Sequence, residues 1–416
     1  MQKDLYDKVK EYRDSNPIRF HMPSHNGECI DIETAMDITE LSFSDNLMQS
    51  ESIIANTEKN IAKAYGSKYS LMLTTGATSG VAISLFAVKN YGSKLLLLGD
   101  THKSVYNYAH LFNFIVTQSD NIEDINPNDF DAIVITSPDY FGKVKDIQKL
   151  KDTTAIVIVD ASHGSHFPFS SKLPSLNTSV ADITILSFHK TLPVLTGGAG
   201  IITNDKELYD LLCYSRNLIH SSSPSYLTMA SIDKAIYEFY LNGENLYSAC
   251  IKEIENFKSI LCDRYSVLET DDITRLCICA KNIDCSKIAK ALEQKNIYIE
   301  MTYYDIMVAI VTPYNYKHLI TFANALNQIE IYDKTTKLDI KKPSKIDIKD
   351  KKIIFENVKD CTNKICASNI GIYPPGTPLL TIGDVITKDI IKFLTTSNVE
   401  IFGLVDGKIP VFKTWI

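Results

Sequence analysis

The stretch TILSFHKTLPVLTGGAG, residues 184–200, places a His-Lys pair directly after a short, mostly apolar run. Such a run is typical of a buried strand, and Lys190 therefore stands where a strand of a parallel sheet would end. Burying an ammonium group is costly, and a lysine in this place can lose its proton and attack a carbonyl group. The alternative is a lysine whose stem is buried while its ammonium reaches water, and the motif alone does not separate the two.

Composition bounds the class of protein. The chain has 416 residues with 45% hydrophobic and 22% charged residues, and its net charge of -7 gives no reason to expect a nucleic-acid partner. Its nine cysteines lack the spacing of a zinc site, so we expect reduced thiols and no metal. The first residues are charged and form no apolar signal core, and no run is long enough to span a bilayer. We expect a cytoplasmic protein that acts on a small molecule and has no membrane partner.

Apolar runs alternate with helix-period segments between about residues 50 and 240. Helical periodicity covers 51–65 and 79–90. The apolar runs are LLLLGD (95–100), DAIVITSPDY (131–140), AIVIVDAS (155–162), DITILSFHK (182–190) and GAGIITN (198–204). Near-continuous apolar strands separated by helices predict an α/β domain with a mainly parallel sheet that is covered on both faces.

The pattern changes near residue 243, where a long helical segment precedes shorter strands and helices of a small α+β domain. A further helix is expected at 354–368. The tract 333–352 carries both charges and is interpreted as a solvated connector, with a partner site as the alternative. The predicted organisation is an N-terminal segment (1–50), a large domain (51–242), a small domain (243–332), the connector (333–352) and a C-terminal part of the small domain (353–416).

Four strand ends of the large domain carry candidate chemistry, because ligands of α/β sheets bind at the carboxyl ends of parallel strands. TTGATSG (74–80) offers a helix N-terminus to a phosphate, or is only a turn. His102 could stack on a planar ligand, or be structural, and Asp160 could meet a cation, or be a helix cap. Together with Lys190, these are the parts needed to hold pyridoxal phosphate: a phosphate cradle, a stacking imidazole, a carboxylate for the pyridinium nitrogen and a Schiff-base lysine.

Several motifs carry a family resemblance that extends over nearly the whole chain. They are RFHMPSHNGE (19–28), DITEL (37–41), TTGATSG, the H-K-S of GDTHKSV (99–105), SPDYFGKVKDI (137–147), VDASHGSHFPF (159–169), SFHKTLPVLTGGA (187–199), SSSPSYLTMASID (221–233) and YPPGTPLLTIGD (373–384). In these the sequence resembles the bacterial ornithine/lysine/arginine decarboxylases of the aspartate-aminotransferase fold (fold type I), especially their short forms.

The resemblance implies a role for each matching residue. Lys190 would bind the cofactor, with Asp160 at its ring nitrogen and His102 stacked on its ring. Ser162 and His163 would line the pocket near the cofactor. The ligands of the phosphate would be Ala77, Thr78, Ser79, Ser187 and His189. The family also implies a homodimer or higher homo-oligomer with active sites at the subunit interface, to which residues 221–226 would contribute, and a link to polyamine biosynthesis.

Departures from the family pattern fall on segments expected to shape the substrate pocket. They lie at 23–26, 44–48, 138–140, 160–163 and 382–384. A basic amino acid substrate would need a distal acid, and Asp139 and Asp384 are the candidates, each with an alternative role in a turn.

Three hypotheses for the activity follow. The first is decarboxylation of arginine, lysine or ornithine with pyridoxal phosphate. The second is another reaction at Cα, such as aminotransfer, which normally needs an arginine for the substrate carboxylate; Arg216 is the main one in the large domain. The third is a weakly catalytic, regulatory protein that binds the cofactor. Retention of Lys190, Asp160 and His102 favours catalysis.

Overall fold

The computed structural model describes residues 3–28, 31–176, 178–334, 352–372, 376–396 and 400–413. The chain divides into two compact units, each made from two separate segments. The first unit comprises Met1–Val88 and Ser137–Thr336, and the second comprises Lys89–Thr136 and Lys337–Ile416. No helix among the described residues combines the length and apolar character that crossing a bilayer demands.

Four buried strands form the centre of the first unit and lie in the order β2, β8, β7, β6. Their bounds are β2 (Tyr69–Leu73), β6 (Ile156–Asp160), β7 (Ile183–Leu186) and β8 (Ala199–Thr203). β6 and β7 are parallel, whereas β8 is antiparallel to both β7 and β2. The apolar runs predicted as strands are therefore strands, and the carboxyl ends of β6 and β7 lie at one edge.

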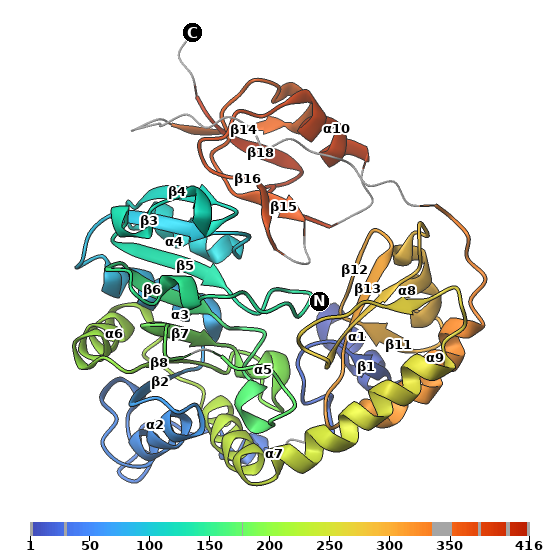
Figure 1. Ribbon diagram of the computed structural model, residues 1–416, viewed down its shortest axis with the longest axis horizontal. Coiled ribbons are helices and arrows are strands. Elements are labelled where there is room, and N and C mark those ends of the chain that lie inside the picture. Colours follow the sequence, from blue (N-terminus) through green and yellow to red (C-terminus); the bar gives the residue numbers. More distant parts are fainter. Residues whose placement is uncertain are drawn as a thin grey trace. The chain divides into compact units, whose positions relative to one another are not determined.

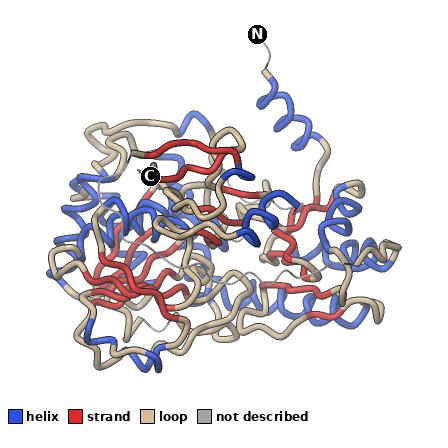
Figure 2. The backbone as a smooth tube through the Cα atoms, turned by 90° about the horizontal axis from the view of Figure 1, so that it is seen from above, coloured by secondary structure: helices blue, strands red, loops and turns tan. Residues whose placement is uncertain are grey.

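Helix α3 (Gly76–Val88) packs on β7 and β8 and against α6 (Lys206–Ile219). It is buried from Ser79 to Leu85, as expected for a helix without a polar face. Gly80 lets it approach the sheet, because a Cβ there would lie 3.0 Å from Ile185 Cγ2. The other helical elements of this part are α1 (Asp4–Asp14), η1 (Thr34–Met36), η2 (Leu47–Gln49), α2 (Ile53–Ala64), η5 (Gln148–Leu150), η6 (Phe167–Phe169) and α5 (Phe188–Thr191). Helix α1 buries no residue and extends outward in Figure 2.

The longest helix, α7 (Tyr226–Ile260), has 35 residues and is the long helix at the bottom of Figure 1. It packs against α2 and η6, and also against α9 (Leu319–Asn327). It passes without interruption through residue 243, where the sequence suggested a domain boundary. The predicted domain boundaries stay a prediction.

A smaller antiparallel sheet follows α7, with strand order β12, β13, β10, β9. Its elements and neighbours are β9 (Ser266–Val267), β10 (Arg275–Cys279), α8 (Cys285–Glu293), β12 (Met301–Tyr303), β13 (Ile306–Ile310), η7 (Tyr316–His318), and the parallel pair β1 (Ile18–Phe20) and β11 (Ile297–Ile299). Phe20, Phe257 and Phe322 stack in the core beneath this sheet. The shorter strands and helices that the sequence predicts after the long helical segment are present.

The second unit begins with three parallel strands in the order β5, β3, β4. Its elements are β3 (Lys94–Leu98), α4 (Lys103–Leu111), β4 (Ile115–Ser119), η3 (Ile122–Asp124), η4 (Pro127–Asp129), β5 (Ala132–Thr136), β14 (Ile353–Asn357), η8 (Val358–Asp360), β15 (Ile370–Ile372), β16 (Pro378–Leu380), α10 (Lys388–Thr396), β17 (Ile401–Phe402) and β18 (Lys408–Phe412). Residues 361–411 have a core of their own around Ile370, Ile390 and Ile409.

The helix predicted at 354–368 is wrong. Ile353–Asn357 is a strand paired antiparallel with β18, and a single 3-10 turn follows it. Its residues alternate between exposed and half-buried, which is the period-two pattern of a strand covered on one face. Most of the predicted connector 333–352 lies outside the described residues.

Candidate active site

Lys190 lies in the short helix α5, which begins at Phe188, just after the carboxyl end of β7. Its Nζ atom is 3.1 Å from Nε2 of His163. Burial lowers the pKa of Lys190, and Arg275 lowers it further, whereas the negative charges of Asp160 and Glu300 raise it. Burial outweighs the two carboxylates, so Lys190 loses its proton more easily than an exposed lysine and is suited to act as a nucleophile.

His163 connects Lys190 to Arg275. Its imidazole is only 5% exposed, and its Nδ1 atom lies 3.2 Å from Nη2 of Arg275. The ring of Tyr140 packs on it with 4.5 Å between centroids. The histidine therefore has a nitrogen-containing partner at each ring nitrogen and an aromatic neighbour on its face.

Asp160 is the last residue of β6 and is 4% exposed. Its Oδ1 atom accepts hydrogen bonds from the backbone N–H of Ser162 at 3.1 Å and from the hydroxyl of Ser162 at 2.5 Å. These donors stabilise the ionised carboxylate, and its charge acts on Lys190. Ser162, predicted to line the pocket, thus orients Asp160.

Glu300 is a site residue that the sequence analysis missed. It lies between β11 and β12, where Oε1 accepts a hydrogen bond from the Tyr140 hydroxyl at 2.8 Å and Oε2 accepts one from the Met22 N–H at 2.9 Å. Its charge raises the pKa of Lys190 and that of His189. A carboxylate that follows the apolar run IYI could have been found by the rule that singled out Asp160.

Arg275 was also missed. It begins β10, is 2% exposed, and its Nε and Nη1 atoms have no hydrogen-bond partner among the described residues. Asp272, which is fully buried, hydrogen-bonds Thr274 and contacts His166 at 3.3 Å. Burial opposes the ionisation of Asp272, but His166 and Arg275 outweigh it and lower the pKa of the carboxyl. The sequence DITR contains both charged residues, but it does not indicate that Arg275 contacts a histidine 112 residues earlier in the chain.

The N-terminus of α3 contains Ala77, Thr78 and Ser79, the predicted phosphate ligands. The first backbone N–H groups of a helix have no intrahelical acceptor, and the helix dipole favours an anion there. The backbone of Gly197 passes close by, since its carbonyl accepts a 2.7 Å hydrogen bond from the Gly76 N–H and a Cβ on it would lie 2.6 Å from Thr74 O. Glycine is therefore required at 197.

Ser187 and His189 flank Lys190 at the end of β7. The His189 Nδ1 atom lies 3.1 Å from Gly198 O and 3.4 Å from the Ser187 hydroxyl. Burial lowers the pKa of His189, and the positive charge of Lys190 lowers it further. Ser24, in a segment that departs from the family pattern, donates hydrogen bonds to the backbone carbonyls of His189 (3.0 Å) and Lys190 (2.5 Å).

Three predicted site residues take part in the hydrogen bonds of a helix cap or a turn. His102 and Asp384 belong to the second unit, where His102 caps α4 and Asp384 accepts hydrogen bonds from the Thr381 N–H (2.6 Å) and hydroxyl (2.9 Å). Asp139 lies in the first unit, and its Oδ1 atom accepts two backbone hydrogen bonds in a turn, each of 2.9 Å. The structure thus brings together Lys190, Asp160, Ser162 and His163 with the unforeseen Glu300 and Arg275.

Solved structures establish the fold. Lysine decarboxylase A from Pseudomonas aeruginosa superposes with a TM-score of 0.75 at 13% identity and covers 91% of this chain and 74% of its own. A serine palmitoyltransferase variant from S. paucimobilis, with a bound PLP-myriocin aldimine, gives a TM-score of 0.58 at 14% identity over 75% of this chain and 86% of its own. The fold is that of the fold type I, pyridoxal-phosphate-dependent enzymes, as predicted.

Sequence comparisons identify similar proteins. The model for "Orn/Lys/Arg decarboxylase, major domain" matches residues 116–313. The uncharacterized protein YaaO of Bacillus subtilis is 26% identical, with 95% of this chain and 94% of that protein covered. An arginine decarboxylase of the same organism is 23% identical, with 98% and 94% covered. Over residues 116–313 this chain is similar to the Orn/Lys/Arg decarboxylases, and over nearly its whole length it is similar to arginine decarboxylases.

Proposed function

We propose that this chain decarboxylates an amino acid with a basic side chain, namely arginine, lysine or ornithine, with pyridoxal phosphate bound at Lys190. The observation that carries the proposal is the amine of Lys190, whose pKa is lowered by burial and which lies in one site with the buried carboxylate of Asp160. A nucleophilic amine and a fixed carboxylate are the two groups that this cofactor needs most from a protein.

The residues present fit the cofactor. The α3 N-terminus with Ala77, Thr78 and Ser79 would bind the phosphate, together with Ser187 and His189, and Asp160 would hold a proton on the ring nitrogen. His102 would stack on the ring, and His163 would lie beside the lysine. When bound, the cofactor accepts the electron pair that is left at Cα as carbon dioxide departs.

The chain's own residues control protons around that step. Ser162 donates two hydrogen bonds to the Asp160 carboxylate and fixes its position. Lys190 and His163, whose Nζ and Nε2 atoms are 3.1 Å apart, are the groups that would return a proton to Cα.

Glu300 is our preferred partner for the side-chain cation of the substrate. It is partly exposed, keeps its carboxylate in the site through Tyr140 and Met22, and acts electrostatically on Lys190. Asp139 and Asp384 remain candidates, although the hydrogen bonds described above for each carboxylate serve a turn. A carboxylate with spare lone pairs would form charge-assisted hydrogen bonds with an ammonium or guanidinium.

Aminotransfer is the main rival. Arg216, the arginine considered for the substrate carboxylate, is 2% exposed and forms an ion pair with Glu58 at 2.6 Å. Because Arg216 is already paired with Glu58, it is poorly placed to bind a substrate carboxylate, and this supports decarboxylation. Carbon dioxide release from arginine, lysine, ornithine and a wider amino acid panel tests the proposal, with Lys190→Ala as the inactive variant and Lys258→Ala as a surface control. Keto-acid production without carbon dioxide would point to aminotransfer, and inertness with bound cofactor to a regulatory role.

We also propose that the chain acts in the cytoplasm, in polyamine biosynthesis, as a homo-oligomer with its active sites at the subunit interface. The eight described cysteines form thiols rather than disulfides, as expected in a reducing compartment.

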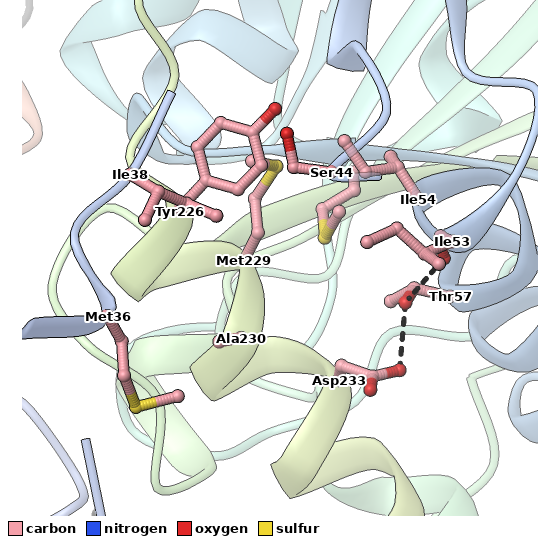
Figure 3. Close-up of a pocket in the computed structure, with 11 residues that line it drawn as sticks. Met36, Ile38, Ser44, Ile53, Ile54, Thr57, Tyr226, Met229, Ala230 and Asp233 are labelled. Atoms are coloured by element: carbon pink, nitrogen blue, oxygen red, sulfur yellow. Dashed lines mark hydrogen bonds between the residues drawn. The ribbon is translucent and has the colours of Figure 1, made fainter. Parts of the chain in front are cut away.

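A pocket of about 400 Å³ lies between the segment 36–54 and α7, lined by Met36, Ile38, Ile53 and Met229 (Figure 3). Met36, Leu41, Phe43 and Ile53 expose 44 to 65% of their surface nearby. Such an apolar surface favours a second copy, and Phe43→Glu should shift the mass in light scattering from oligomer to monomer; an unchanged mass would exclude this surface.

A further inference from the structure

The hydrogen bonds of His163 have a direction. Nδ1 lies 3.2 Å from Nη2 of Arg275, and Nε2 lies 3.1 Å from Nζ of Lys190. A guanidinium has only N–H donors and keeps its proton in proteins, so Nδ1 of His163 must act as the acceptor. A neutral imidazole carries one N–H, and here that proton is left on Nε2, the atom that faces Lys190.

The Nε2–H group then needs an acceptor. An ammonium at Lys190 has only donors and no lone pair, whereas a neutral amine has one. The order Arg275 to His163 to Lys190 is therefore consistent only with an unprotonated lysine. A protonated Lys190 would confront the donor Nε2–H of His163, or would require His163 to lose both protons.

We propose that Arg275 is a positioning residue that fixes the proton of His163 on Nε2, so that His163 donates a hydrogen bond to Lys190 and holds it as a neutral amine. The inference rests on the proposed role of Lys190 as the cofactor lysine, because only a neutral amine adds to an aldehyde. It assigns a role to Arg275, a buried arginine whose Nε and Nη1 atoms have no hydrogen-bond partner among the described residues.

The charges around the three residues agree with this order. Asp160 and Glu300 favour the ammonium form of Lys190, while burial and the positive charge of Arg275 favour the amine. His189 precedes Lys190 in the chain, and its pKa is lowered, first by burial. Asp272, which precedes β10 and contacts His166, interacts electrostatically with Arg275. The ring of Tyr140 packs on the His163 ring.

The test uses the full chain before cofactor is added. Protein labelled with 15N-histidine reports by NMR which nitrogen of His163 carries the proton, and His163→Gln identifies the signal. The same samples are treated briefly with acetic anhydride between pH 6 and 10, and mass spectrometry compares acetylation of Lys190 with that of the exposed Lys287. Arg275→Met removes the donor, Arg275→Lys keeps the charge without the fork of N–H groups, and Arg264→Met is the matched control.

In the unmodified chain we expect the proton on Nε2. In Arg275→Met we expect it to move at least partly to Nδ1, with acetylation of Lys190 at pH 7 about tenfold slower, as for a rise of one unit in its pKa. Arg275→Lys should also lose the fixed tautomer, and Arg264→Met should change neither readout. A proton on Nδ1 or on both nitrogens in the unmodified chain, or an unchanged tautomer in Arg275→Met, would overturn the proposal. Failure to bind pyridoxal phosphate or to release carbon dioxide would instead sink the proposed function and leave the tautomer result standing.

Discussion

Arg216 and Lys190 are two basic side chains within the same unit, and the chain treats them in opposite ways. Arg216 forms an ion pair with Glu58 at 2.6 Å, and Glu58 also accepts a hydrogen bond from the Met72 N–H at 3.0 Å. Lys190 Nζ instead lies against an imidazole, and burial lowers the pKa of this lysine. The first arrangement stabilises a charged side chain, and the second makes it easier for a side chain to lose its charge.

The difference separates a structural cation from a reactive amine. Breaking a buried ion pair leaves an uncompensated charge and strongly destabilises a protein, whereas a neutral amine can be removed at little cost in stability. Variants in the two regions should therefore fail in different assays.

The largest effect is expected for Lys190→Ala. Carbon dioxide release should fall more than about a thousandfold, because the group that binds the cofactor is lost. The yellow absorbance of the lysine-bound cofactor should vanish, while the midpoint of urea unfolding of the cofactor-free protein stays the same or rises. A retained absorbance at Lys190→Ala would place the cofactor on another residue.

Glu58→Gln should lower stability, in contrast to Lys190→Ala. It leaves Arg216 buried without its anion, so the free energy of unfolding should fall by about 3 to 5 kcal/mol, measured by urea denaturation. The double variant Glu58→Leu with Arg216→Met should recover most of that loss. If Glu58→Gln instead abolished cofactor binding at unchanged stability, the assignment of Arg216 as structural would be wrong.

Glu300→Gln tests the substrate side of the reactive region. We expect KM for the preferred basic amino acid to rise roughly tenfold to a hundredfold, because a charge-assisted hydrogen bond contributes about 1.5 to 3 kcal/mol. Steady-state kinetics on basic and neutral amino acids should show the rise for the basic ones alone. A larger and equally selective rise in Asp139→Asn would assign the role to Asp139.

The smallest effect extends the comparison to an anion. Burial raises the pKa of Asp45, but backbone N–H groups of Glu51, Ser52 and Ile54, among others, outweigh it and lower the pKa to about 2. The stabilisation is present above the usual pKa of 3.8 and is lost as pH falls through about 2. Asp45→Asn should cost about 1 to 2 kcal/mol at pH 7, allowing for partial exposure, and progressively less below about pH 4 in urea titrations. A cost that did not vary with pH would show that charge is not its origin.

Local patterns predicted the part of the site that follows parallel strands. Asp160 and Lys190 each stand at or just after the end of an apolar run, so one rule of sheet geometry located both. Glu300 lies between β11 and β12, where the same rule could have found it, but its partner Tyr140 is 160 residues away in sequence. Arg275 begins β10 of the smaller sheet, and its partner His163 is 112 residues away. Arg216 could be noted but not interpreted, since its partner Glu58 precedes it by 158 residues. The sequence predicts a helix at the strand Ile353–Asn357, because the pairing of this strand with β18 is likewise not visible in its own residues.

The length of helix α7 determines how Arg275 is placed relative to His163. Its 35 residues span roughly 50 Å, and it contacts both η6, beside the loop that carries His163, and α9 beneath the smaller sheet that carries Arg275. At Gly243 it passes so close to Phe169 that a Cβ would lie 2.5 Å from the carbonyl oxygen of that residue. One residue inserted after this point would rotate everything downstream by about 100° and advance it by about 1.5 Å. The alignment of Arg275 with His163 therefore depends on the number of residues in α7, although none of the residues placed around Lys190 belongs to this helix.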